Sequence, residues 1–106
     1  MKLLTKEISR GLQAQYSKGS DLEQMVVCKI FDPCGRRTWY LMNQDPDDLD
    51  YLWGIVKGFE LEMGSVLLSE LESVRNKLGL GLERDLHFKP VSAKEVWEVL
   101  SHGKHI

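Results

Sequence analysis

The sequence has little of the features that would point to a secreted, disulfide-bonded or zinc-binding protein. It contains only two cysteines in 106 residues, Cys28 and Cys34. Cys28 lies in a predicted strand and Cys34 in the turn that follows, so extended backbone holds the thiols beyond bridging distance. Their spacing also differs from the paired cysteines of a zinc site. We therefore expect two free thiols, which suit a reducing cytoplasm, and no cofactor.

Long apolar runs and a surplus of one charge are also missing. No stretch approaches the ~20 apolar residues of a membrane span, and the first residues lack the apolar core of a signal peptide. The formal net charge of −2 argues against a protein that coats nucleic acid through bulk electrostatics. A local basic patch stays open as an alternative, because Arg36 and Arg37 form an adjacent basic pair in a predicted turn. A solvated turn tip is the favoured interpretation of this pair.

What is present indicates one ordinary globular domain covering residues 1–106. The chain is 42% apolar and 28% charged, and it has three each of Trp, Tyr and Phe. This length is close to the commonest domain size, and a chain of this length buries enough surface to fold without disulfides or metals.

The order of secondary structure predicts an α+β fold. Thr5 caps a first helix whose apolar stripe is Leu4, Ile8, Leu12 and Tyr16, and Gly19 ends it. Strands are predicted over 25–31, 37–43, 51–59 and 66–68, with a type I turn at 32–35 and an acidic loop at 45–50. Capping boxes at 69–72 and 92–95 predict two further helices, separated by a strand that Pro90 ends. The prediction is an antiparallel sheet of about five strands with three helices, in the order α-β-β-β-β-α-β-α.

The stretch from Leu82 to Pro90 carries the most pointed chemical hypothesis. Read as a strand, it places Glu83, Asp85, His87 and Lys89 on one face, with neighbouring side chains about 6.5–7 Å apart. Carboxylates beside an imidazole are suited to binding a divalent cation or to acid–base chemistry, and they equally suit the wet side of a half-exposed strand. The second interpretation is favoured, because no second element supplies further ligands.

Arg84 breaks the apolar register of this predicted strand. Its neighbours in that register are Leu82, Leu86 and Phe88, which are expected to lock into the core. We expect Arg84 to lie inside and to form a structural ion pair with a carboxylate, since its planar guanidinium suits buried pairs.

Aromatic residues on neighbouring strands offer a candidate interface. Trp39, Tyr51, Trp53 and Phe59 belong to strands predicted to be adjacent, and aromatic strand faces can stack single-stranded bases. A sheet core is the favoured interpretation, because little basic charge accompanies them. Several strands are also apolar on both faces, so a patch that three helices leave uncovered would form a dimer or partner interface.

Several short motifs, taken in order and spacing, resemble the DUF2958 family over residues 2 to about 92. They are Lys2-Leu3-Leu4-Thr5, Phe31-Asp32-Pro33-Cys34-Gly35, Thr38-Trp39-Tyr40, Gly54-Ile55-Val56-Lys57-Gly58-Phe59-Glu60, Leu68-Ser69-Glu70-Leu71-Glu72 and Glu83-Arg84-Asp85-Leu86-His87-Phe88-Lys89-Pro90. The chain departs from the family pattern at Asn43-Gln44, where an acidic residue is common, and at Val66, where an aromatic residue is common. The last helix lies largely outside the resemblance.

The resemblance implies a small bacterial protein, of a kind often carried by plasmids, integrative elements and phages, with no established activity and so no catalytic residues to carry over. Our leading hypothesis is a non-enzymatic accessory protein that acts through protein–protein contact as a homodimer, away from membranes and without a small-molecule substrate. The alternatives are a nucleic-acid-associated factor of plasmid maintenance or anti-defence, and a metal-dependent hydrolase using Glu83, Asp85 and His87.

Overall fold

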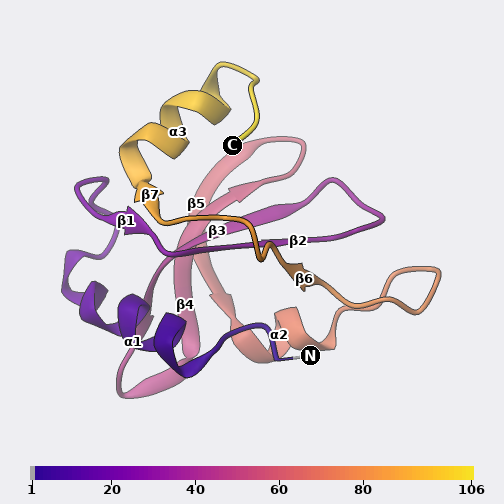
Figure 1. Cartoon of the computed structure of the whole chain (residues 1–106), viewed down its shortest axis with the longest axis horizontal. Helices are drawn as coiled ribbons and strands as arrows, with labels where there is room; N and C mark the ends of the chain where they lie inside the picture. Colours follow the sequence, from indigo (N-terminus) through magenta and orange to yellow (C-terminus); the bar gives the residue numbers. More distant parts are fainter. Residues whose placement is uncertain (1) are drawn as a thin grey trace.

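The computed structural model describes residues 2–106 (Figure 1). Its first element is the predicted helix, α1 (Lys6–Ala14). The Oγ1 of Thr5 accepts a hydrogen bond from the amide of Ile8 at 3.1 Å, so Thr5 caps the helix as predicted. A short 3-10 turn, η1 (Tyr16–Lys18), continues the helix, and Gly19 ends it with φ 51°, in the left-handed region that favours glycine.

The remaining elements are two helices and seven strands, and the strands pair in antiparallel sheets, which confirms the α+β class. They are β1 (Met25–Val26), β2 (Cys28–Phe31), β3 (Thr38–Asp45), β4 (Asp48–Lys57), β5 (Leu61–Leu67), α2 (Leu68–Ser73), β6 (Glu83–Arg84), β7 (Val91–Ser92) and α3 (Ala93–Ser101). Five strands form one sheet in the order β5-β4-β3-β2-β6, and β1 pairs with β7 in a separate ribbon. The five-stranded sheet and three helices match the prediction.

The predicted strand over 25–31 is split at Val27. Met25 lies opposite Ser92 of β7, whereas Cys28 lies opposite Leu41 of β3. The amide of Val27 still donates to the carbonyl of Leu41, at 2.9 Å. One continuous apolar run therefore forms strands of two different sheets, and the apolar periodicity does not show where one strand ends and the next begins.

Two turns differ from their predicted positions. The acidic segment at 45–50 is a tight hairpin turn rather than a loop, with Asp45 opposite Asp48. The chain reverses around Phe59, and strand β5 begins at Leu61, before the predicted strand over 66–68. Gly54 allows a close backbone approach between β4 and β3, because a Cβ there would collide with the carbonyl oxygen of Tyr40.

Both predicted capping boxes are wrong in detail. Helix α2 begins at Leu68, and Ser69 instead donates its amide and hydroxyl to the carboxylate of Asp50, at 2.7 and 2.8 Å. Ser92 does precede α3, but within residues 2–106 its hydroxyl caps no helix amide. At α2, Asp50 from the distant strand β4 has replaced the local capping contact.

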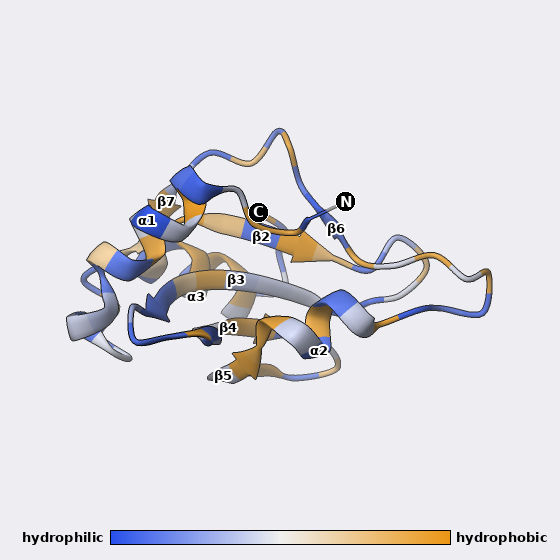
Figure 2. Ribbon diagram, turned by 90° about the horizontal axis from the view of Figure 1, so that it is seen from below, coloured by the Kyte–Doolittle hydropathy of each residue, from blue (hydrophilic) through white to orange (hydrophobic). Residues whose placement is uncertain are grey.

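The sheet is covered on both faces. One core lies between the sheet and helices α1 and α2, and it includes Leu12, Ile30, Leu41, Leu52 and Leu71. The other lies between the sheet and α3, and it includes Tyr40, Met42, Ile55, Val96 and Leu100. Each face of the sheet thus carries a core and at least one helix, and the edge at β5 stays open (Figure 2).

A buried amide fastens α1 to the sheet. Gln44 is 1% exposed. Its Oε1 accepts from the Ser9 hydroxyl at 2.7 Å and from Gln13 at 3.2 Å, and its Nε2 donates to the carbonyl of Leu49.

Within residues 2–106, no helix is long and apolar enough to cross a bilayer.

Candidate functional site

The segment proposed as a reactive face leaves the sheet after two residues. Strand β6 contains only Glu83 and Arg84, opposite Phe31 and Ile30 of β2. Asp85 then opens a turn, because its Oδ1 accepts the amide of His87 at 2.9 Å. The predicted strand over 83–89 is wrong beyond Arg84, so the side chains do not follow the two-residue spacing that would have aligned them.

The four ionisable residues of this segment consequently separate. Glu83, His87 and Lys89 are exposed, whereas Asp85 is half-buried with its Oδ2 3.7 Å from the Nζ of Lys29. Lys29 also donates to the carbonyl of Ile106 at 2.9 Å and lies over the ring of Tyr40. The carboxylate of Asp85 thus accepts a hydrogen bond within the turn and also pairs with Lys29.

The metal hypothesis loses its geometric basis with that separation. In the part of the chain from residue 2 to residue 106, no three His, Cys, Asp or Glu side chains gather closely enough to hold a metal ion. Convergence of Glu83, Asp85 and His87 on one cation was the observation that the hydrolase alternative needed.

Arg84 is half-buried rather than inside, and its partners are not carboxylates. Its Nη1 donates to the backbone carbonyls of Lys2, at 3.2 Å, and Leu3. Among residues 2–106, no acidic side chain lies within 4.0 Å of its guanidinium, so the predicted ion pair is wrong. Arg84 instead fixes the segment that precedes α1.

The apolar side of the segment is only partly in the core. Leu82 is buried in the core under α1 and α2, and Phe88 packs into the opposite core, where its ring meets Tyr40 edge-on at 6.4 Å. Leu86 is 71% exposed, so its predicted core position is wrong. The turn at Asp85 explains this, because it changes which side chains face inward.

A groove runs between α1 and this segment. Its volume is about 540 Å³, and Ile8, Val27, Cys28, Arg84 and Phe88 are among its lining residues. Burial raises the pKa of the Cys28 thiol to about 12, with a smaller opposing effect from Arg84. That thiol is protonated at neutral pH and is therefore not a nucleophile.

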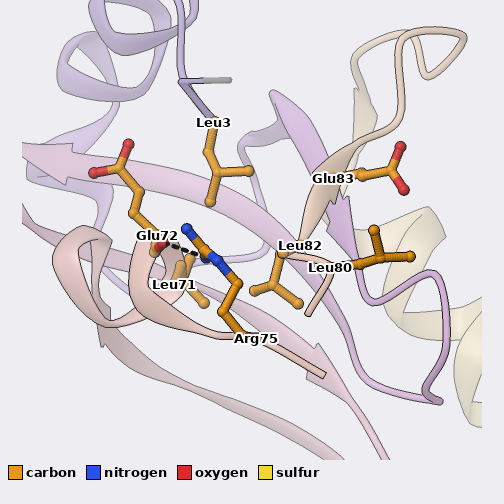
Figure 3. A pocket seen from close by; sticks show the side chains of 8 residues that line it. Leu3, Leu71, Glu72, Arg75, Leu80, Leu82 and Glu83 are labelled. Carbon is orange, nitrogen blue, oxygen red and sulfur yellow. Dashed lines mark hydrogen bonds between the residues drawn. The ribbon is translucent and has the colours of Figure 1, made fainter. Parts of the chain in front are cut away.

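A second hollow, of about 410 Å³, lies on the other side of β6 between α2 and the loop that follows it (Figure 3). Arg75 lies across it beside Leu71 and Leu82, while the carboxylate of Glu83 lies apart from the guanidinium. The Nη1 of Arg75 donates to the carbonyls of Glu72 and Val74, at 3.0 and 2.7 Å. Arg75 therefore braces the end of α2 and is not aligned with an acidic partner for catalysis.

The predicted interface aromatics do not share one surface. Trp39 is buried in the core under α1 and α2, and Trp53 packs in the core under α3. Tyr51 is half-buried, and Phe59 is 90% exposed at the β4–β5 turn. Phe59 is the most exposed of the four, while Tyr51 and Trp53 line one hollow and Trp39 lines another together with Phe59.

Phe59 has a neighbour that the sequence separates from it by more than twenty positions. The guanidinium of Arg36, from the β2–β3 turn, lies 5.7 Å from the centre of the Phe59 ring. Arg36, Arg37 and Phe59 line a common hollow. Sequence analysis noted the basic pair and the aromatic residue separately, and only the strand order brings the two turns together at one end of the sheet (Figure 1).

Comparison with known proteins gives one match to a family model and no individual relative. The family model described as "Protein of unknown function (DUF2958)" matches residues 3–103. This confirms the resemblance and corrects its extent, because the match includes α3. Neither the curated proteins nor the solved structures gave a significant match.

Proposed function

We propose, from the premise that the chain belongs to the DUF2958 family of unknown function, that it is a non-enzymatic accessory protein acting through protein–protein contact as a homodimer. The free edge of β5 is the observation that carries this proposal. The mobile-element setting and the cytoplasmic location belong to the same proposal, and they rest on the family resemblance and the free thiols.

Strand β5 is the outermost strand on its side of the sheet (Figure 2). It pairs with β4 over seven residues in unbroken register, from Leu61 opposite Lys57 to Leu67 opposite Tyr51. Natural sheets usually protect such edges with lysine, proline or a bulge. Leu61–Leu67 contains neither residue and its pairing has no bulge, so the edge is ready to accept another strand.

The strand is also complementary to itself. In an antiparallel pair centred on Gly64, Leu61 of one subunit faces Leu67 of the other, and Met63 faces Ser65. Glu62, the charged residue of the strand, faces Val66 rather than its own copy. Leu67 is 38% exposed, so this pairing would bury apolar surface while keeping the like charges apart.

Gly64 provides a test with matched variants. A Cβ at this position meets nothing within 4 Å, so a side chain fits the single subunit. In the dimer, two copies of Gly64→Lys place like charges opposite each other, and so do two copies of Gly64→Asp. We expect each charged variant to be monomeric, their equimolar mixture to reassociate, and Gly64→Ala to stay dimeric.

Light scattering after size exclusion measures these states. The parent should have twice its chain mass of 12.2 kDa at high micromolar concentration. A parent of 12.2 kDa would overturn the homodimer, and a Gly64→Lys variant that dimerises like the parent would overturn the β5 edge as its interface.

A further inference from the structure

We infer that the end of the sheet formed by the β2–β3 and β4–β5 turns, with Phe59, Arg36 and Arg37, binds single-stranded nucleic acid. The surface combines one aromatic ring with two guanidinium groups from a different hairpin. The inference does not rest on the proposed dimer, because the contacts that carry it all lie within one subunit.

Phe59 is placed as a contact residue rather than a core residue. It is 90% exposed, and it projects from the turn between Lys57 and Leu61. The backbone there is held locally, since the amide of Gly58 donates to the carbonyl of Glu60 at 3.0 Å. An exposed ring on a fixed turn is a stacking platform, and base stacking is tolerant of sequence because every base has a flat face.

The arginines supply the second half of the recognition. Arg36 lies against the Phe59 ring at 5.7 Å, and both Arg36 and Arg37 are exposed. Together with Gly58 and Phe59 they line a hollow of about 300 Å³. Guanidinium groups bind phosphate oxygens through paired hydrogen bonds, so a phosphate can lie beside a base that stacks on the ring.

A neighbouring hollow limits the path of such a strand. Its volume is about 360 Å³, and Arg37, Phe59, Glu60 and Glu62 are among its lining residues. The two carboxylates would repel phosphates, so the backbone of the nucleic acid should pass on the side of Arg36. The charge of the whole chain, −2, adds no general attraction, and binding should therefore be local and strongest at low salt.

An acidic protein segment is the competing ligand for two arginines. It would use the charges of Arg36 and Arg37 but would gain nothing specific from a flat ring. The contact between Phe59 and Arg36 favours nucleic acid, because alternating bases and phosphates match a ring beside guanidinium groups.

Fluorescence anisotropy with a labelled single-stranded DNA of mixed sequence, at low salt, tests the inference. The parent should bind this strand more tightly than an abasic strand of equal length and charge. Phe59→Ala and Phe59→Leu should each weaken binding at least about fivefold, and Phe59→Trp should retain it. Arg36→Gln and Arg37→Gln should each lower the slope of log affinity against log salt by about 0.7.

Leu49→Ala is the matched control, because Leu49 is 53% exposed at the opposite end of the sheet, and it should bind like the parent. Circular dichroism of each variant checks that folding is intact, as expected for exposed positions. The inference is overturned if the parent shows no anisotropy change at low salt, if the abasic strand binds equally well, or if Phe59→Leu binds like the parent. Equal competition by poly-glutamate would also overturn it in favour of an acidic protein partner.

Discussion

At the scale of single residues, burial determines what the chemically interesting groups can do. Cys28 is 3% exposed, and the carboxylate of Asp85 is occupied by the turn amide of His87 and by Lys29. Arg84 is held by two backbone carbonyls. Residue types that suggest chemistry in the sequence therefore hold the fold together. Among the exposed exceptions, Phe59 and Arg36 lie in turns.

Cys28 gives the free energy of unfolding a pH dependence that can be measured. Its pKa is raised from 9.0 to about 12 in the folded protein, so the unfolded chain loses the thiol proton first as pH rises. The contribution of Cys28 to stability is therefore constant below pH 9 and falls between pH 9 and 12, by up to about 1.4 kcal/mol per pH unit.

Urea denaturation of the parent and of Cys28→Ala from pH 7 to 10.5 isolates this effect. The stability difference between them should shrink above pH 9 and be flat below it. Cys34→Ala, which replaces an exposed thiol, is the control and should follow the parent. Parallel curves for the parent and Cys28→Ala across the whole range would contradict the assignment.

At the scale of elements, periodicity predicts what is regular and misses what depends on distant partners. Helix α1 and strands β3 and β4 follow from apolar patterns and turn residues. The predicted strand over 66–68 begins later than β5, because Glu60, Glu62 and Gly64 are residue types typical of a turn, whereas pairing with β4 makes this segment a strand. The segment after Arg84 alternates like a strand, but Asp85 uses its side chain to close a turn.

The candidate site was predictable to the same limited extent. The sequence drew attention to Asp85, Arg84 and Phe59 individually, and each has a definite structural position. Their partners, Lys29, the carbonyl of Leu3 and Arg36, come from elsewhere in the chain and depend on strand order. Spacing along one strand carries no information about such neighbours.

Asp50 tests the replacement of local capping by a distant partner. Its carboxylate accepts both hydrogen bonds from Ser69 in the first turn of α2. Asp50→Ala should destabilise the protein by about 0.5–2 kcal/mol, the usual cost of losing a cap. Asp50→Asn keeps one acceptor oxygen and should cost less, and urea denaturation at pH 7 would show both. A free energy of unfolding for Asp50→Ala equal to that of the parent would show that these bonds contribute nothing.

At the scale of the whole molecule, the two edges of the sheet differ. Helices cover both faces, and on one edge β6 is only two residues long, with the segment before α1 bound to it through Arg84. The other edge, β5, is seven residues long and regular. A long, regular edge of this kind is what the proposed strand pairing with a second copy requires.

Hydrogen exchange of the backbone amides in β5 tests this account most directly. In an antiparallel pair with β4, alternate amides of Leu61–Leu67 point away from the sheet. Edge pairing predicts that these outward amides become protected as protein concentration rises from low to high micromolar, while the amides of β4 stay equally protected throughout. Outward amides that exchange at unprotected rates at every concentration would contradict the edge-paired homodimer.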